Sequence, residues 1–195
     1  GRAVIAALRR DVHTLSGTTR QTNLGQGPEG IPLYQIGELG PDLDWSQAVA
    51  GAEIVVHLAA RVHMMKERAT KAGDIHLPVQ LTANAEGTRR LAEVAAAVGV
   101  RRLVFCSSSV TVGFGPRSAP GDEATPLGDL DGVYGVNTPL RWYHDTKRDA
   151  EALVGSFVAR GLETVVVNPD YVVGAWDLKP TSGGLIVAMA KRPVP

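Results

Sequence analysis

The sequence predicts an α/β protein built on a doubly wound parallel sheet with helices on both faces. Apolar runs rich in Val and Ile alternate with longer stretches of helical period, which is typical of strand-helix-strand crossovers. Proline or glycine stands where the helical stretches are expected to begin and end. With 195 residues, 44% of them hydrophobic, the chain can bury an ordinary globular core.

Four apolar runs are predicted as strands: Val12 to Leu15, Ile54 to Leu58, Arg102 to Cys106 and Glu163 to Val167. Most of them are continuously apolar rather than alternating. That pattern is typical of strands covered on both faces, so we expect them in the interior of a sheet.

Two stretches are predicted as helices. Pro78 to Val98 carries apolar residues at helical spacing, with Pro78 suited to the first turn and Gly99 to the stop. Trp142 to Arg160 has the same pattern, and Gly161 closes it.

The segments Gly25 to Pro41 and Gly113 to Pro139 are rich in proline and glycine, and we interpret both as surface connections. The second is long enough to be a functional loop. The chain opens at Gly1 directly on a helical pattern, with no strand before it, and closes after a helix-like stretch at residues 184–190. We therefore expect a piece of a longer protein.

Charge and composition exclude several classes of function. Twenty Lys and Arg balance twenty Asp and Glu, so the field that would attract nucleic acid or an acidic membrane is missing. No apolar run approaches the roughly 18 residues of a membrane span, and the start lacks the pattern of a secretory signal. We expect a cytoplasmic protein. The single cysteine, Cys106, excludes an internal disulfide and a multi-thiolate metal site. We expect that the protein binds no metal and that Cys106 is a buried structural thiol.

The strongest local feature is Tyr143 and Lys147, an i, i+4 pair on one face of a predicted helix. A phenol, with a pKa of about 10, is a poor base at neutral pH, but a nearby ammonium favours the phenolate and lowers that pKa. Such a tyrosine can exchange a proton with a secondary alcohol while hydride moves at the carbon. Taken alone, the pair is more often part of an ordinary solvated helix face.

Two further elements stand at the ends of predicted strands. Ser107, Ser108 and Ser109 come just after a buried strand, at the edge where open α/β sheets hold ligands. Leu58, Ala59 and Ala60 follow another strand, and their small side chains would let a flat ligand lie close to the backbone. Each has a plainer interpretation, as the start of a polar loop or a tight strand-helix turn. His57 by itself is more often a satisfied core histidine than a ligand.

In this order, the motifs resemble the extended short-chain dehydrogenase/reductase family, and the resemblance covers essentially the whole chain. Residues 55–60 are similar to its strand-four signature, 84–88 to its helix element and 107–113 to its serine strand. Tyr143 and Lys147 resemble its catalytic pair. Residues 168–174 resemble the segment that passes the nicotinamide, with Asn168 where arginine is commoner. Residues 177–181 resemble a bacterial branch of sugar epimerases and dihydroflavonol-reductase-like proteins.

The resemblance implies a Rossmann-like dinucleotide-binding domain over 1–175, without its first strand, and the start of a substrate-binding region over 176–195. It implies that Tyr143 is the acid/base, Lys147 its pKa tuner and ribose anchor, and Ser108 the donor to the substrate oxygen. Ser109 is the alternative if the register shifts by one residue. Asn84 would help to position the helix or an active-site water. Gly1 would be the third glycine of the phosphate-binding turn.

Cofactor choice depends on the stretch Leu15 to Arg20. It contains no acid to accept bonds from the ribose, but it offers Thr18 and the guanidinium of Arg20, which can hold a phosphate. NADP is therefore favoured over NAD, unless Arg20 simply points into water. Glu38 and Leu39 stand where the family has an acidic-hydrophobic pair beside the adenine. The predicted cofactor-binding residues are Gly1, Thr18, Arg20, Glu38, Leu39, Leu58, Ala59, Ala60, Asn84, Tyr143, Lys147, Asn168 and Pro169.

The predicted function is NAD(P)-dependent hydride transfer at a secondary-alcohol or ketone carbon of a small-molecule substrate, with a nucleotide sugar favoured. A ketone reductase of the dihydroflavonol-reductase or hydroxysteroid-dehydrogenase type is the alternative. Dehydration is disfavoured, because Ser109 and Val110 stand where sugar-nucleotide dehydratases carry an Asp-Glu pair. A non-catalytic NADP sensor is a further alternative, although such relatives usually lose the Tyr or the Lys. The Tyr143 helix packs against its twin in relatives, which leaves a homodimer open.

Overall fold

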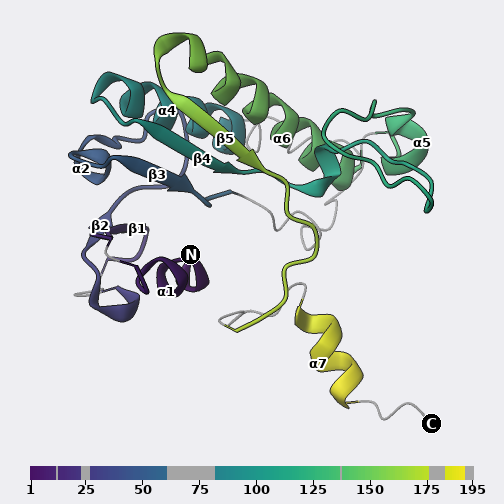
Figure 1. The fold of residues 1–195 in the computed structure, drawn as a ribbon, viewed down its shortest axis with the longest axis horizontal. Coiled ribbons are helices and arrows are strands. Elements are labelled where there is room, and N and C mark those ends of the chain that lie inside the picture. The colour runs from purple at the N-terminus through teal and green to yellow at the C-terminus, as the bar shows by residue number, and fades with distance from the viewer. Residues whose placement is uncertain (12, 23–26, 61–81, 137, 176–182, 192–195) are drawn as a thin grey trace, which may run out of the picture.

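A computed structural model describes residues 1–11, 13–22, 27–60, 82–136, 138–175 and 183–191. Three strands, β3 (Ile54–His57), β4 (Arg102–Cys106) and β5 (Glu163–Val167), form a parallel sheet in the order β3-β4-β5 (Figure 1). Two shorter strands, β1 (Gly17–Thr19) and β2 (Leu33–Gln35), form a separate parallel sheet. The predicted α/β class and its parallel strands are confirmed.

The N-terminal strand prediction is wrong in position. The strand lies at Gly17–Thr19 rather than at Val12 to Leu15, because its pairing with β2 decides where it begins. Gly17 faces Leu33 so closely that a Cβ there would lie 3.0 Å from the leucine Cδ2. Strand β2 falls inside a segment predicted as a surface connection, since three residues between Pro32 and Ile36 are too few to show a strand period.

One face of the three-stranded sheet is covered by α4 (Gly87–Ala97) and α6 (Pro139–Ser156) (Figure 1). The core between these layers contains fully buried side chains from both helices and from β4. The largest are Leu91, Leu103, Phe105, Val154 and Leu162.

The expectation that these strands are covered on both faces is not met at β3 and β5 within the described residues. Strands β3 and β5 alternate, with Ile54, Val56, Val165 and Val167 between 37% and 43% exposed. The physical reason is that α4 and α6 pack on the same face. Within the described ranges, no helix covers these four side chains.

The two predicted helices are present, but their ends differ from the predicted ends by a few residues. Helix α6 begins at Pro139 rather than Trp142, because the Thr138 hydroxyl caps it by accepting a bond from the Arg141 amide, 3.1 Å away. A 3₁₀ turn over Val158–Arg160 extends it, and Gly161 ends it with a φ of +88°. Gly99, with a φ of +81°, stops the chain after α4.

A π-helical turn over Thr82–Glu86 leads into α4, while Pro78 and the rest of that predicted start lie outside the described residues. The terminal patterns are confirmed as α1 (Arg2–Leu8) and α7 (Gly183–Lys191). The remaining elements are short: α2 (Ser46–Val49), α5 (Leu130–Tyr134) and the 3₁₀ turns η1 (Pro28–Gly30) and η3 (Ser109–Thr111). Of these, α5 lies in the second predicted connection. The expected boundary at 175/176 adjoins undescribed residues and stays a prediction.

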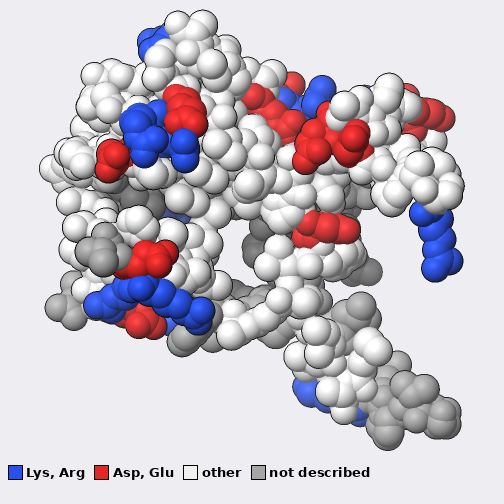
Figure 2. All heavy atoms as spheres, in the orientation of Figure 1, with Lys and Arg blue, Asp and Glu red and all other residues white. Residues whose placement is uncertain are grey.

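Charged side chains of both signs are interspersed on the face shown in Figure 2, and neither sign dominates a large area of it. This matches the formal net charge of zero. Among the helices in the described part of the chain, none has both the length and the apolar character needed to cross a bilayer.

Candidate active site

Helix α6 carries both Tyr143 and Lys147 toward the carboxyl end of β4. The Lys147 side chain is only 3% exposed, and its Nζ donates to the carbonyl oxygen of Cys106, 2.7 Å away. The same Nζ lies 5.0 Å from the centre of the Phe105 ring. Burial lowers the pKa of Lys147, and the nearby Cys106 and Glu151 side chains oppose that effect. Cys106 itself is partly exposed rather than buried, which corrects the expectation for its thiol.

The Tyr143 phenol meets the Ser108 side chain. Burial raises the pKa of Tyr143, and a hydrogen bond with Ser108 works in the opposite direction. The expectation that Lys147 lowers the pKa of Tyr143 therefore does not hold in this structure. The reason is geometric, because the Lys147 ammonium is bound to the Cys106 carbonyl instead of the phenol.

The structure also separates the two candidate serines. Ser108 caps the η3 turn and bonds to Tyr143, whereas the Ser109 hydroxyl donates to Asp170 Oδ1 at 3.1 Å. The backbone amide of Ser109 donates to the Pro169 carbonyl at 3.0 Å, so this segment runs beside the end of β5. The geometry thus brings Ser108 and Tyr143 together and directs Ser109 elsewhere.

Asn84 lies behind this pair, in the π-helical turn before α4. Its side chain is 2% exposed, and its Nδ2 reaches Thr146 Oγ1 at 3.5 Å, a long hydrogen bond. The Thr146 hydroxyl in turn donates to the Tyr143 carbonyl at 2.9 Å. Asn84 is therefore linked to the Tyr143 turn of α6.

Strand β3 ends at His57, which the structure places in the core. The ring lies between Trp45 and Phe105, with centroids 6.1 and 5.9 Å away. The Thr88 hydroxyl donates to the Asn84 carbonyl, so it accepts at 3.1 Å from His57 Nε2, which carries the proton. Burial and then the charge of Lys147 lower the pKa of His57 to about 3. The interpretation as a satisfied core histidine is supported.

The residues just after β3 are largely accessible to solvent. Leu58 is 38% exposed, Ala59 is exposed and Ala60 is half-buried. At the end of β5, Asn168 and Pro169 are half-buried, and the Asn168 amide is directed at the serine segment. The predicted elements at the ends of the three strands therefore share one edge of the sheet.

Of the predicted adenosine-side residues, Thr18 lies in the two-stranded sheet and Arg20 and Glu38 follow its strands. Gly1 precedes α1, and among the described residues nothing lies within 4 Å of a Cβ built on it. Thr18 in β1 is exposed. Arg20, just after β1, donates from Nη1 to both carboxylate oxygens of Glu38, at 2.9 and 2.8 Å. Leu39 is half-buried, packed against the core. No local pattern indicates the Arg20-Glu38 pairing, because it depends on strand register.

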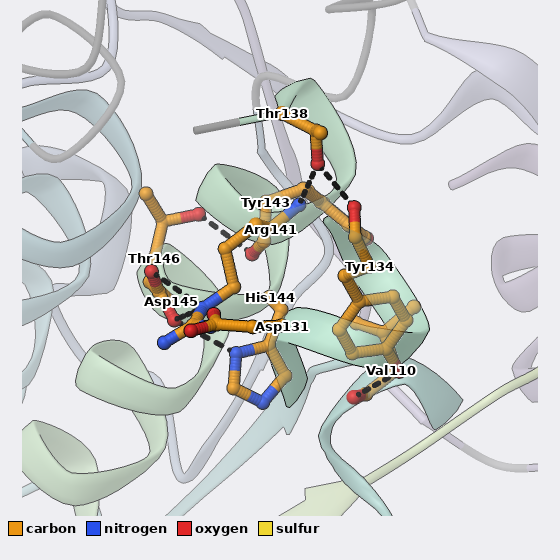
Figure 3. Close-up of polar contacts among 9 residues, drawn as sticks. All are labelled: Val110, Asp131, Tyr134, Thr138, Arg141, Tyr143, His144, Asp145 and Thr146. Atoms are coloured by element: carbon orange, nitrogen blue, oxygen red, sulfur yellow. Dashed lines mark hydrogen bonds and ion pairs between the residues drawn. The ribbon is translucent and has the colours of Figure 1, made fainter. Parts of the chain in front are cut away.

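Sequence reasoning also missed the helix that braces the serine segment. In α5, the Tyr134 hydroxyl donates to the Val110 carbonyl at 2.8 Å, and its ring lies 5.5 Å from that of His144 (Figure 3). Burial raises the pKa of Tyr134. Arg141 joins the two helices by pairing with Asp131 in α5 and Asp145 in α6 (Figure 3).

Removing the Tyr134 hydroxyl should loosen this brace. Tyr134→Phe leaves the Val110 carbonyl without its partner, and we expect a loss of about 1 kcal/mol in the free energy of unfolding. Urea titration of the full-length protein measures it. The substitution Tyr171→Phe, at a side chain 78% exposed, serves as control and should leave the urea midpoint unchanged.

No group of three or more His, Cys, Asp or Glu side chains in the described ranges is arranged to hold a metal ion. The polar groups at this edge are instead a phenol, a hydroxyl and a buried ammonium. That set suits proton transfer and the binding of a polar ligand.

Comparison with known proteins identifies the family. Residues 1–193 match the NAD dependent epimerase/dehydratase family. The chain is 32% identical over 137 residues to sterol demethylase protein B of Methylococcus capsulatus, covering 70% of this chain and 37% of that protein. It is 28% identical over 143 residues to a UDP-glucose 4-epimerase of Vibrio cholerae, covering 73% of this chain and 40% of that one.

Among solved structures, one neighbour is a short-chain dehydrogenase/reductase superfamily protein of Agrobacterium tumefaciens with bound NAD. It is 32% identical, with a TM-score of 0.63, over 86% of this chain and 45% of that protein. The chain spans about half the length of the relatives it matches. The parallel sheets, the Tyr143-Ser108 contact with Lys147 beside it, and these matches agree: the chain belongs to the NAD-dependent epimerase/dehydratase family of Rossmann-like extended short-chain dehydrogenases/reductases.

Proposed function

We propose that the full-length protein transfers hydride between NAD(P) and a secondary-alcohol or ketone carbon, with Tyr143 exchanging the proton. One observation carries the proposal: the Tyr143 phenol and the Ser108 side chain lie close enough, beside the end of β4, for Ser108 to lower the pKa of the phenol. The Lys147 ammonium is held on the carbonyl of Cys106, two residues before Ser108.

The chemistry assigned to each residue follows from its surroundings. Burial holds the Tyr143 phenol in its protonated form, so it can donate a proton to a carbonyl oxygen that is being reduced. Ser108 can donate a second hydrogen bond to the same oxygen. The Lys147 ammonium is held on the Cys106 carbonyl rather than on the phenol, so we assign it to anchoring the cofactor ribose. Bound NAD(P) supplies the hydride or accepts it.

The residues present fit a dinucleotide at this edge. Leu58 and Ala59 are exposed at the end of β3, where a flat ligand could lie close to the backbone. We propose that Gly1 lies near the pyrophosphate, that Leu58 to Ala60 and Asn84 line the middle, and that Lys147, Asn168 and Pro169 lie near the nicotinamide end. Thr18, Arg20, Glu38 and Leu39 would hold the adenosine end.

We keep NADP as the proposed cofactor, with NAD as the alternative. The choice depends on whether the Arg20 guanidinium binds a 2′-phosphate or stays paired with Glu38. Arg20 can hold a 2′-phosphate, and no acid stands in β1 to repel one. Glu38 opposes this preference, because its carboxylate already accepts two hydrogen bonds from Arg20. The pair is exposed, so the cost of breaking it is small.

Replacing Glu38 with glutamine tests this balance. Since the variant frees the guanidinium and removes a negative charge, we expect the preference for NADP over NAD to rise about two- to fivefold, the equivalent of a weak exposed ion pair. The ratio of kcat/KM for NADPH and NADH measures it. Glu29→Gln, at an exposed ion pair with Arg9, is the matched control. An unchanged ratio in Glu38→Gln would remove Glu38 from cofactor selection.

For the substrate we propose a nucleotide sugar, supported by the similarity to a UDP-glucose 4-epimerase. A ketone reductase is the second candidate, favoured by similarity to a 3-beta-hydroxysteroid dehydrogenase. Elimination is disfavoured, because the Ser109 hydroxyl is paired with Asp170 and Val110 has no acid-base group. Residues 176–195 are proposed to begin the substrate-binding region.

The amount of dinucleotide that stays bound through purification distinguishes an epimerase from a reductase. The full-length protein is purified, denatured by heat, and the released small molecules are weighed by mass spectrometry. An epimerase returns the hydride within one turnover, so stoichiometric dinucleotide is expected, whereas a reductase exchanges its cofactor and should release little. The mass also reports the 2′-phosphate. A protein that binds NADP but transfers no hydride to any ketone or sugar nucleotide would be the non-catalytic sensor.

A further inference from the structure

We propose that Glu151 is a positioning residue: its carboxylate, placed on α6 beyond Lys147, holds the serine segment so that the Ser108 hydroxyl stays against Tyr143. This inference rests on the proposed function and assigns a role to a residue that none of the sequence motifs included. It follows from a cluster of hydrogen bonds that joins α6 to the ends of β4 and β5.

Helix periodicity places Glu151 with the catalytic pair. It follows Lys147 by four residues and Tyr143 by eight, so all three lie along one face of α6. The Glu151 side chain is 15% exposed, unlike that of Asp149, which lies on the exposed face of the same helix. Its only described ion pair is a long one, 3.5 Å from Arg148 to Oε2. The other oxygen, Oε1, is turned toward the serine segment.

Three donors from separate segments meet at Glu151 Oε1. The Ser107 hydroxyl donates from the end of β4, and Thr111 Oγ1 lies 2.6 Å away in the η3 turn. Asn168 Nδ2 donates from the end of β5 at 2.9 Å. An ionised carboxylate accepts bonds only, so it can serve three donors at once. The single side chain therefore ties together both segments that flank Ser108.

The same partners hold the backbone of Ser108. Its carbonyl lies 2.8 Å from Thr111 Oγ1 and 3.3 Å from Asn168 Nδ2. Because the Thr111 hydroxyl has one hydrogen, it bonds either this carbonyl or Glu151 at a given moment. Asn168 Nδ2 also lies 2.9 Å from Thr111 Oγ1, and because the amide has two hydrogens it bonds two of its three acceptors at a given moment. The peptide of Ser108 is thus held by Thr111 and Asn168, while its side chain interacts with the Tyr143 phenol.

Glu151 also contributes charge. Burial lowers the pKa of Lys147, and the negative charge of Glu151 is among the effects that raise it again. Removing that charge should make the ammonium lose its proton at lower pH. This gives the proposal a readout that a purely structural hydrogen bond would not change.

The test compares Glu151→Gln with Asp149→Asn in the full-length holoenzyme. Glutamine keeps the shape but removes the charge and brings its own donors into a site built from donors. We expect kcat to fall roughly 10- to 100-fold through misplacement of Ser108. The KM for cofactor should change by less than about twofold, because no cofactor contact is lost. The alkaline limb of kcat should move to lower pH. Asp149→Asn should leave all three unchanged.

A second substitution keeps the test decisive if Glu151→Gln folds poorly. Thr111→Val removes a hydroxyl from the same cluster without changing its volume much, and it should also lower kcat. Because both residues act through one cluster, the double variant should lose less than the product of the two single effects. The proposal would be overturned if the double variant lost kcat by the full product of the two single effects. It would also be overturned if a folded Glu151→Gln kept both the kcat and the alkaline limb of the unmodified protein.

Hydrogen exchange of the cofactor-free protein gives a readout independent of turnover. Residues 107–111 should exchange faster in Glu151→Gln than in the unmodified protein, while α4 stays unchanged. If the unmodified protein transfers no hydride, the proposed function fails, but this exchange comparison still tests the hold of Glu151 on the serine segment. Equal exchange in the two proteins would contradict that hold.

Discussion

Replacing Tyr143 with phenylalanine is expected to lower kcat of the full-length protein by about 10³-fold, the usual size of a general acid/base contribution. The substitution removes the one proton that the phenol would exchange and leaves the ring in place. The cofactor Kd should change little, because the substitution removes one hydroxyl and keeps the aromatic ring. Single-turnover measurements of hydride transfer, together with fluorescence titration of the dinucleotide, separate these two quantities.

The matched control is Tyr34→Phe, which removes a phenol hydroxyl from β2, in the other sheet. It should leave hydride transfer unchanged. Ser108→Ala should lower kcat less than Tyr143→Phe, because it deletes a hydrogen-bond donor to the substrate oxygen but not the proton that is transferred. Full turnover in Tyr143→Phe would remove this residue from the mechanism and would refute the proposed function in its present form.

The second large effect concerns stability below neutral pH. The folded-state pKa of His57 is lowered to about 3, mainly by burial, against about 6.5 in an unfolded chain. The neutral imidazole is therefore favoured by folding. This contribution to stability is fully present above pH 6.5 and is lost as the pH falls toward 3. The slope is about 1.4 kcal/mol per pH unit in that window, or roughly 2 kcal/mol between pH 7 and pH 5.

His57→Phe should remove that slope. Phenylalanine keeps a ring between Trp45 and Phe105, and the Thr88 hydroxyl still has the Asn84 carbonyl as its acceptor. The measurement is the free energy of unfolding in urea at pH 7 and at pH 5, for the variant and the unmodified protein. We expect the unmodified protein to lose about 2 kcal/mol more than the variant on acidification.

Thr88→Val is the control for this experiment. It deletes the hydroxyl that accepts from His57 Nε2 but keeps the imidazole buried, so it should lower stability at both pH values and preserve the acid-dependent loss. An equal acid-dependent loss in His57→Phe and in the unmodified protein would show that other groups cause it.

Several parts of the site could be predicted because they depend on local pattern. The i, i+4 spacing of Tyr143 and Lys147 requires only that the segment be helical, and α6 is helical there. The apolar runs that became β3, β4 and β5 were evident from composition, as were the glycine stops after α4 and α6. Strand β1 was misplaced because its pairing partner, β2, has too short a signal to be recognised.

Taken alone, the sequence determined the α/β class, the parallel strands, and the helix face that carries a phenol and an amine. Each of these follows from interactions between residues near one another in the chain. Only the tertiary structure decided that Ser108 rather than Ser109 meets Tyr143, that Lys147 binds the Cys106 carbonyl, and that Arg20 pairs with Glu38. Those contacts join segments 18 to 41 residues apart, and their geometry depends on strand register and helix packing, which no local pattern specifies.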